Sequence, residues 1–439
     1  MTTPKLIITP RKPAVLADFA TTQDVLVRLQ APDAPAEALP TRGPLHLALV
    51  IDRSGSMAGK PLAEARRAAT FVIDGLASQD RAALVVYDDK VETLVPLTGL
   101  EDRATLRQAI SRIDDGGSTN LHGGWFAGAE ALAPATAPGI ISRVILLSDG
   151  CANAGLCDPA AIFAQCRGLA DTGVTTSTYG LGSSFNEDLM IGMARAGQGN
   201  SYYGQTAEDL MDPFREEFAL LNALCARRLV LTLQPAAGVT TEVLNDYTPT
   251  DGGWQLPDLA YGGEAWALVR LTLTARAASA EPSALLTVGL RYADLAGEPR
   301  VVQPTLFALP AVPAGAFAAL AEDALVARRA GELEAARLQR EARAAAQRRD
   351  WASVDRLVVQ TRALGESNLW VADVAAEMST LAKGRDEMRF AKESAYSAQR
   401  MSNRLAPSCE AEDHNTPSPS FLRRKGAQGK AAPDSAGKK

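Results

Sequence analysis

The stretch Leu45–Met57, which reads LHLALVIDRSGSM, decides the predicted fold. Its first part, Leu45–Ile51, is a short apolar run, the pattern of a strand that is buried on both faces of a sheet. Polar residues begin at Asp52, and apolar residues with helical spacing follow at Pro61–Leu76. The stretch therefore predicts a buried strand whose carboxyl end carries polar side chains and leads into a helix.

This alternation of apolar runs and helical segments continues as far as Cys225. Further strands are predicted at Ala82–Tyr87, Val91–Leu97, Val144–Ser148, Val174–Gly180 and Ser201–Tyr203. Further helices are predicted at Ala104–Ile113, Leu121–Leu132, Pro159–Thr172, Asp188–Ala196 and Ala207–Leu224. Residues 43–225 are therefore expected to form a doubly wound, Rossmann-like domain with a mostly parallel sheet.

Polar side chains follow these strands at three places. Asp52, Ser54 and Ser56 come directly after the first strand, and Asp149 follows Val144–Ser148. Thr119 lies in a glycine-rich loop before a predicted helix. Ligands of open α/β sheets bind at the carboxyl edge of the strands, so we expect these side chains to share one site.

The chemistry of this set favours a hard cation. Asp52 and Asp149 supply two carboxylates, and the serine and threonine hydroxyls supply neutral oxygens. Mg²⁺ takes about six oxygens in near-octahedral geometry and keeps some waters. Gly55 lets the backbone bend so that Ser54 and Ser56 can face one point. Because few protein oxygens bind directly, a carboxylate from another molecule can fill an open position.

The pattern Asp-x-Ser-x-Ser, then Thr, then Asp resembles the metal-ion-dependent adhesion site of the von Willebrand factor A family. All five positions match: Asp52, Ser54, Ser56, Thr119 and Asp149. The resemblance covers about residues 44–225, and its flanks look most like bacterial members and the inter-alpha-trypsin-inhibitor heavy-chain type. It implies a bound Mg²⁺, with Mn²⁺ or Ca²⁺ as alternatives, that captures an acidic side chain of a protein partner.

Two further regions are expected to contain strands. Residues 1–42 hold strand-like runs at Leu6–Thr9 and Asp24–Gln30, followed by a Pro/Ala-rich linker. Residues 226–312 contain short alternating segments punctuated by Gly and Pro, a pattern typical of an antiparallel β-sandwich or half of one. We expect the early strands to complete this sandwich, with the α/β domain inserted between them.

The last third of the chain has a different composition. Residues 313–405 are rich in Ala, Arg, Glu and Leu, and helices are predicted at Ala314–Gln347, Trp351–Ala363 and Asn368–Arg404. This α-helical region is expected to be a structural packing unit. Residues 406–439 are rich in Pro, Ser, Gly and Lys and are expected to be a disordered basic tail.

Composition excludes several classes of protein. The net charge of −6 argues against a whole-chain nucleic-acid binder, so nucleic acid is left only to the basic tail, for which a solvated role is preferred. The sequence contains no run of about 18 apolar residues, so a membrane span is not expected. Met1–Pro13 lacks the pattern of a signal peptide. Five cysteines without close pairing fit reduced thiols. These features predict a cytoplasmic protein.

Simpler interpretations remain open for single residues. Asp52 could cap the following helix, and Asn153 could be a plain turn former or could orient the Asp149 loop. His122 could tune a metal with pH but is favoured as a helix-packing residue. Cys151 and Cys157 lack the usual zinc spacing. Residues 55–60 resemble a phosphate loop only superficially, since one residue and the final hydroxyl are missing.

The predicted function is a non-enzymatic adaptor or scaffold in a cytoplasmic complex, whose metal takes Asp or Glu of a protein partner. The family resemblance suggests AAA+ ATPases and kinase or phosphatase systems as partner classes. One alternative is a metal-dependent hydrolase, with Asp114, Asp115 or His122 as the local candidates for a general base. Another is a structural scaffold with an unused metal site.

Overall fold

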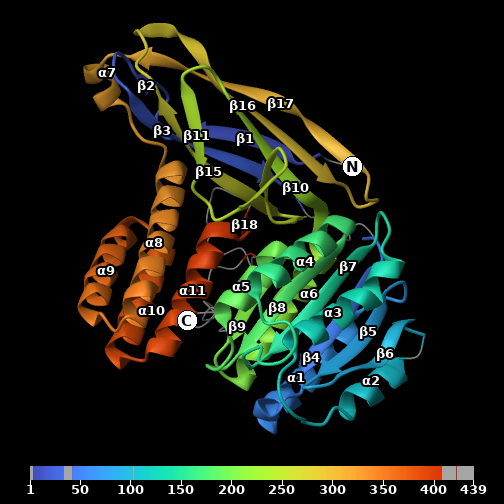
Figure 1. Cartoon of the computed structure of the whole chain (residues 1–439). Helices are drawn as coiled ribbons and strands as arrows, with labels where there is room; N and C mark the ends of the chain where they lie inside the picture. Colours follow the sequence, from blue (N-terminus) through green and yellow to red (C-terminus); the bar gives the residue numbers. More distant parts are fainter. Residues whose placement is uncertain (1–2, 34–41, 102, 408–421, 423–439) are drawn as a thin grey trace, which may run out of the picture.

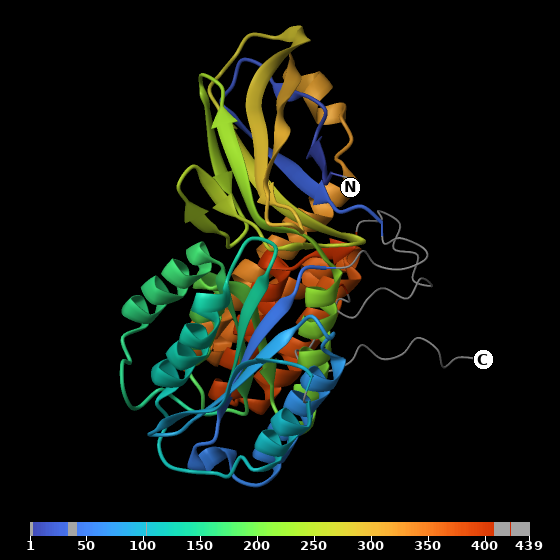
Figure 2. The same ribbon diagram turned by 90° about the vertical axis from the view of Figure 1, so that its right-hand side faces the viewer.

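The computed structural model describes residues 3–33, 42–101, 103–407 and 422. Three units are visible (Figure 1): an α/β domain, a pair of antiparallel sheets above it and a group of helices beside it. Figure 2 shows the same arrangement from the side, with the sheets at one end of the molecule. The predicted tail, 406–439, lies outside the described residues except for 406, 407 and 422, and most of the Pro/Ala-rich linker does too.

The α/β domain is built on a six-stranded sheet in the order β6-β5-β4-β7-β8-β9. Its strands are β4 (Leu45–Asp52), β5 (Arg81–Tyr87), β6 (Val91–Gly99), β7 (Ile141–Ser148), β8 (Val174–Leu181) and β9 (Gln198–Gly204). All neighbours are parallel except β6, which pairs antiparallel with β5. Every residue of β4 and β7 is buried. The prediction of a mostly parallel sheet is confirmed, and β5 and β6 form an antiparallel pair at its edge.

Helices cover both faces of this sheet because successive side chains of a strand point to opposite sides. The helices are α1 (Lys60–Gly75), α2 (Arg103–Ser111), α3 (Leu121–Leu132), α4 (Pro159–Thr172), α5 (Glu187–Ala196) and α6 (Met211–Ala223). Leu47 and Leu49 of β4 pack in one apolar core with α1, α2 and α6. Ala48 and Val50 pack in another core with α3, α4 and α5. The layers therefore leave the strand ends as the polar edges of the domain.

The remaining strands form two antiparallel sheets. One contains β1 (Lys5–Pro10), β3 (Thr21–Gln30), β15 (Gly263–Leu273), β11 (Val239–Val243) and β18 (Ala406–Pro407). The other contains β12 (Thr248–Thr250), β13 (Gly253–Gln255), β10 (Leu224–Pro235), β16 (Ser279–Ala293), β17 (Pro299–Val312), β2 (Val15–Leu16) and β14 (Leu259–Ala260). Val27 and Ala267 of the first sheet share an apolar core with Leu231 and Val288 of the second.

The two sheets join parts of the chain that are far apart in sequence. β3 pairs with β15 from Gln30 opposite Glu264 to Thr21 opposite Leu273. The α/β domain therefore lies, in sequence, between two strands that are neighbours in one sheet. β10 begins directly after α6, so the last helix of the α/β domain runs straight into the second sheet.

The helical group consists of α7 (Ala314–Ala319), α8 (Ala324–Gln347), α9 (Trp351–Leu364), α10 (Leu369–Gly384) and α11 (Glu387–Asn403). Two helix predictions were wrong, because 314–347 and 368–404 are each broken into two helices. In the first, Asp323 caps α8 through its side chain, and its own N–H donates to the Arg11 carbonyl. In the second, Arg385 adopts a left-handed conformation and Asp386 caps α11. Side-chain caps at these positions start new helices.

The helical group is held to the α/β domain by a small charged cluster. The Nζ atom of Lys392 on α11 lies 2.7 Å from Oε2 of Glu187 and 2.5 Å from the Phe185 carbonyl oxygen. Arg343 of α8 lies 2.9 Å from Oε1 of Glu187 and also pairs with Asp188. Tyr396 of α11 is fully buried in the core formed by α3, α4 and α5. The helices therefore form an integral part of the molecule.

We expect Lys392→Met to lower the free energy of unfolding by about 2 kcal/mol, because it leaves a largely buried carboxylate with one charged partner fewer. Burial alone would raise the pKa of Glu187, but Lys392 and Arg343 hold it below its ordinary value. The full loss of unfolding free energy should therefore appear above the ordinary glutamate pKa. It should shrink as the pH falls through the lower pKa that Glu187 has in the folded protein. Urea unfolding across this pH range measures it. The exposed Lys383→Met is the control, and equal losses in both variants would contradict the prediction.

Candidate metal centre

The first ligand candidate, Asp52, is fixed at the carboxyl end of β4. Its side chain is fully buried. The Ser54 N–H donates to its Oδ1 at 2.9 Å, and the Ser148 hydroxyl at the end of β7 donates to its Oδ2 at 2.7 Å. Asp52 does not cap α1, because Gly59 occupies that N-cap position. The helix-cap interpretation of Asp52 is therefore wrong.

The turn after β4 brings both serines toward Asp149. The Ser54 and Ser56 hydroxyl oxygens lie 3.2 Å apart, and the Ser56 hydroxyl donates to Oδ1 of Asp149 at 2.7 Å. Residues 55–57 form a short 3-10 turn, which Met57 anchors with a fully buried side chain. Gly55 donates its N–H to the Gly117 carbonyl, so this turn is tied directly to the glycine-rich loop.

Thr119 joins the same site through two loops. Its N–H donates to Oδ1 of Asn153 at 2.9 Å, and the Asn153 N–H donates back to the Thr119 carbonyl at 3.2 Å. A Cβ atom added at Gly150 would lie 3.1 Å from Oγ1 of Thr119, which places this hydroxyl beside Asp149. Asn153 thus ties the Thr119 loop to the segment after β7. The five residues predicted from three separate motifs lie together at one edge of the sheet.

The electrostatics of the site favour a cation. Burial raises the pKa of Asp52. Burial and, to a lesser extent, the charge of Asp52 raise the pKa of Asp149 to about 6, although the Ser56 hydrogen bond opposes this shift. Neither carboxylate forms an ion pair with any described residue. Two buried carboxylates with neighbouring hydroxyls are the oxygen donors that a hard divalent cation prefers, so the donor set fits Mg²⁺.

Other residues near the site have ordinary packing roles. A ring nitrogen of His122, Nε2, lies 2.8 Å from Oε1 of Gln165 on α4, and the ring stacks on Phe126. Cys151 donates its thiol to the Ser184 carbonyl, and Cys157 is exposed. Across the described part of the chain, no group of three or more His, Cys, Asp or Glu residues could hold a metal. The site around Asp52 and Asp149 is not such a group, because it has two carboxylates and takes its other oxygens from hydroxyls.

Asp88, just after β5, supports the site and is absent from the set predicted from sequence. It is 5% exposed. Its Oδ2 accepts from Nε of Arg53 at 3.1 Å and from the Gly117 N–H at 3.4 Å, and its Oδ1 accepts from the Lys90 N–H. A Cβ atom at Gly116 would lie 1.9 Å from its Oδ2, so the loop can approach only as glycine. Asp88 thus positions the loop that carries Thr119. The sequence signal that could have identified Asp88 is its position directly after the apolar strand β5, like that of Asp52 after β4.

We expect Asp88→Ala to weaken Mg²⁺ binding at least about tenfold, because residues that orient metal ligands typically contribute that much to affinity. The loop would lose the hydrogen bond from the Gly117 N–H to Asp88, and Arg53 would lose its ion pair, while all five ligand candidates remain in place. Titration calorimetry with Mg²⁺ measures the effect. The neighbouring Asp89 is exposed, and Asp89→Ala is the control. Unchanged affinity in Asp88→Ala would remove Asp88 from the site.

Comparison with known proteins identifies the family of the α/β domain. Residues 46–216 match the family model described as the von Willebrand factor type A domain. This part of the chain is a von Willebrand factor type A (VWA) domain. Among the described residues, the structure contains no helix long and apolar enough to cross a membrane.

The sequence relatives each match less than half of this chain. The chain is 30% identical over 210 residues to the uncharacterized protein sll0103 of Synechocystis, covering 46% of this chain and 48% of that protein. It is 31% identical over 193 residues to the uncharacterized protein YfbK of Escherichia coli, covering 44% and 33%. It is 29% identical over 188 residues to human inter-alpha-trypsin inhibitor heavy chain H3, covering 40% and 21%. The matched segment thus spans less than half the length of each relative.

Two solved structures share the fold beyond this domain. A von Willebrand factor type A protein from Catenulispora acidiphila aligns with a TM-score of 0.68 at 19% identity, covering 86% of this chain and 89% of that one. The ArnB paralog VWA2 from Sulfolobus acidocaldarius aligns with a TM-score of 0.62 at 18% identity, covering 91% and 99%. At these identities the likeness concerns the fold alone.

Proposed function

We propose that the chain is a metal-dependent protein-interaction module that captures an acidic side chain of a protein partner. The metal would be held by Asp52, Ser54, Ser56, Thr119 and Asp149, with Mg²⁺ as the leading candidate and Mn²⁺ or Ca²⁺ as alternatives. VWA domains generally mediate protein–protein interactions, often with a metal. The role proposed for this chain is protein–protein interaction that depends on the bound metal.

The observation that carries the proposal is the pair of carboxylates. Asp52 and Asp149 are both more than nine-tenths buried, and neither has a cationic partner among the described residues. Such carboxylates are costly unless a cation compensates them. A divalent cation would keep part of its positive charge beside only two protein carboxylates, so that it would attract a third one from outside. Ser56 is exposed, which leaves the site open to a partner.

The other two units support a scaffold role. The two antiparallel sheets share an apolar core with α1 and α6 of the VWA domain. The helical group is held by Lys392 and Arg343. The sheets and the helical group would keep the metal centre in a fixed orientation within a larger complex. We extend the proposal to a cytoplasmic, non-enzymatic adaptor, with AAA+ ATPases and kinase or phosphatase systems as partner classes to test first.

The experiment is capture of proteins from a native bacterial extract on the purified chain, once with Mg²⁺ and once with EDTA, followed by mass spectrometry. We expect at least one partner that is retained only with Mg²⁺. Addition of free glutamate-rich peptide should release that partner. Identical sets of bound proteins in Mg²⁺ and EDTA would show that the metal centre is not the recognition surface.

A further inference from the structure

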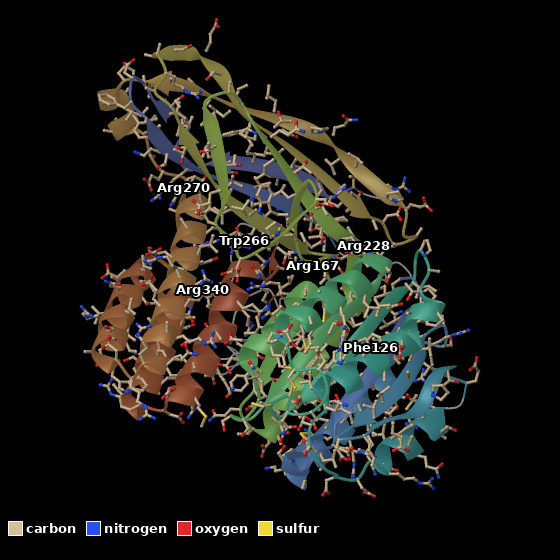
Figure 3. The ribbon with its side chains drawn as sticks, in the orientation of Figure 1. Phe126, Arg167, Arg228, Trp266, Arg270 and Arg340 are labelled. Atoms are coloured by element: carbon tan, nitrogen blue, oxygen red, sulfur yellow. The ribbon has the colours of Figure 1, made fainter. Side chains whose placement is uncertain are left out.

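A groove of about 920 Å³ lies between the VWA domain and the second sheet. One wall comes from the ends of α4 and α5, and the other from β12, β13, β16 and the start of β10. Its volume is near the upper end of the range of ligand pockets, about 300–1,000 Å³, and far exceeds that of a single small anion. Figure 3 shows Arg228 and Arg167 labelled at this junction.

The groove is more basic than the rest of the chain. Four arginines line it, Arg167, Arg195, Arg228 and Arg291, together with Asp171 and Asp251. The whole chain, by contrast, has a net charge of −6. The excess of positive side chains in this hollow would attract an anionic group and raise its local concentration.

Three of these arginines have no carboxylate partner within the part of the chain that the structure describes. Arg195 pairs with Asp246. No described carboxylate oxygen lies within the 4.0 Å of an ion pair from the guanidinium groups of Arg167, Arg228 or Arg291. The Arg291 side chain donates to the Asp251 backbone carbonyl at 2.9 Å. Their capacity to bind a carboxylate in a bidentate manner is therefore unused by described residues.

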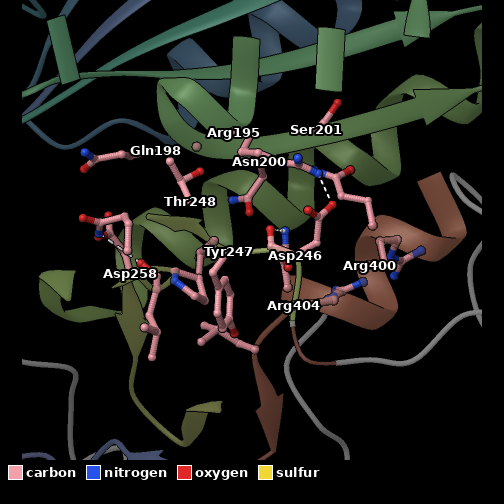
Figure 4. Close-up of a pocket in the computed structure, with 18 of the residues that line it drawn as sticks. Arg195, Gln198, Asn200, Ser201, Asp246, Tyr247, Thr248, Asp258, Arg400 and Arg404 are labelled. Carbon is pink, nitrogen blue, oxygen red and sulfur yellow. Dashed lines mark hydrogen bonds and ion pairs between the residues drawn. The ribbon is translucent and has the colours of Figure 1, made fainter. Parts of the chain in front are cut away.

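A neighbouring pocket shows the opposite arrangement. Figure 4 shows this smaller cavity of about 130 Å³, which shares Arg195, Gln198 and Thr248 with the groove. Two of its arginines are compensated: Arg143 lies 3.2 Å from Glu217, and Arg404 lies 3.3 Å from Glu216. Paired arginines of this kind hold the units together. Arg167, Arg228 and Arg291, which have no such carboxylate partner among the described residues, line the open groove instead.

The backbone aims Arg228 into the groove at a conformational cost. Its φ angle is 55°, in the left-handed region that non-glycine residues rarely adopt. It lies at an irregularity in the pairing of β10 with β16, between Arg227 and Val230. Such bulges redirect a side chain and often occur beside functional sites. The guanidinium lies over Gly173, where an added Cβ atom would be 2.7 Å from it. Gly173 caps the carboxyl end of α4, and the negative end of this helix dipole favours the positive charge of Arg228. The dipole does not saturate the N–H donors of the guanidinium, which can still bind a carboxylate.

We propose that this groove binds an acidic segment of a partner protein, independently of the metal centre. Bidentate recognition of carboxylates by Arg167, Arg228 and Arg291 would hold the segment. A nucleic acid fits less well, because the single aromatic residue among the described lining residues, Tyr292, is 8% exposed and offers no surface for base stacking. Gly173, beside Arg228, comes directly before β8, and the lining residue Gln198 begins β9, whereas Asp149 follows the carboxyl end of β7. The groove and the metal centre thus occupy opposite edges of the sheet.

The test measures binding of a short fluorescein-labelled peptide, in which glutamate alternates with glycine, by fluorescence anisotropy in EDTA. We expect Arg167→Ala combined with Arg228→Gly to raise the Kd about tenfold. Glycine at 228 accepts the left-handed backbone, so this variant should keep its fold. Arg348→Ala combined with Arg356→Ala removes the same charge from exposed positions on the helical group and should leave the Kd unchanged.

Several results would overturn the proposal. They are absence of binding, equal binding of a matched glutamine peptide, equal weakening in both double variants, or tighter groove-dependent binding of single-stranded RNA. The test is separate from that of the metal centre, because Asp149→Ala should still bind the peptide in EDTA. Failure of Mg²⁺-dependent capture would therefore leave the groove proposal standing, and the reverse also holds.

Discussion

Asp149→Ala is expected to abolish Mg²⁺-dependent partner capture, with a loss of at least about a hundredfold in affinity. Removing one of two carboxylates from a divalent site removes a charge-assisted ligand, and each such interaction contributes several kcal/mol in a buried setting. The carboxylate also holds the Ser56 hydroxyl through a 2.7 Å hydrogen bond, so a second donor would lose its orientation. The effect should therefore exceed that of Asp88→Ala, which leaves every ligand candidate in place.

The same variant should remain folded. In the metal-free protein the pKa of Asp149 is raised to about 6 by burial and by Asp52, which shows that its charge is unfavourable there. Alanine removes this unfavourable charge at the cost of one hydrogen bond, so the melting temperature in EDTA should change little. Mg²⁺ should raise the melting temperature of the original protein by mass action but not that of the variant.

The matched control is Asp115→Ala. Asp115 is an exposed carboxylate in the loop just before Gly116, and it was one of the candidate bases for a hydrolase. We expect it to retain both Mg²⁺ binding and partner capture. Capture that survives in Asp149→Ala, or that is lost equally in Asp115→Ala, would contradict the assignment of the metal centre.

The sequence predicted the ligand candidates, but of their supports it offered only Asn153, as one of two open interpretations. Asp52, Ser54 and Ser56 form a local motif, and parallel strands bring their carboxyl ends to one edge, so the meeting with Asp149 follows from strand order. The tie between Asn153 and Thr119 depends on how two loops close, and no spacing rule gives it. The role of Asp88 likewise depends on the approach of Gly116 and Gly117, which only the folded loop reveals.

Long-range pairing and helix breaks show a similar limit. Alternation of apolar residues marks β3 and β15 as strands, but it does not specify that Gln30 lies opposite Glu264. The helix break at Arg385 directly follows Gly384, a poor helix former. Its signal was Asp386, an N-cap residue, whose effect depends on the packing of both α10 and α11. Tertiary contacts decide between one long helix and two shorter ones.

The second large effect concerns Glu217, which is fully buried on α6. Its Oε1 accepts from the Ser177 hydroxyl at 2.6 Å and lies 3.2 Å from Arg143. Its Oε2 accepts from Asn200 at 2.8 Å and from the Tyr202 hydroxyl at 2.9 Å. One carboxylate thus connects α6 to β7, β8 and β9.

Glu217→Ala is expected to lower the free energy of unfolding by about 3–5 kcal/mol. Among the described residues, the substitution leaves the buried Arg143 with Asp258, 3.9 Å away, as its one remaining ionic partner. It also leaves the donors of Asn200 and Tyr202 without this acceptor, and breaking a buried pair from one side carries this cost. Urea unfolding in EDTA measures the loss. Glu130→Ala, at an exposed position of α3, is the control and should change stability by less than about 0.5 kcal/mol.

Glu217→Gln separates charge from shape, because the amide keeps one acceptor for Tyr202 or Ser177 but does not neutralise Arg143. Its loss should therefore lie between those of the control and of alanine. Since α6 continues directly into β10, a loosened α6 weakens the junction between the VWA domain and the second sheet. Mg²⁺ affinity should be preserved, because none of the groups that Glu217 contacts is a ligand candidate. A loss of stability below about 1 kcal/mol in Glu217→Ala would show that this carboxylate does not hold α6 in place.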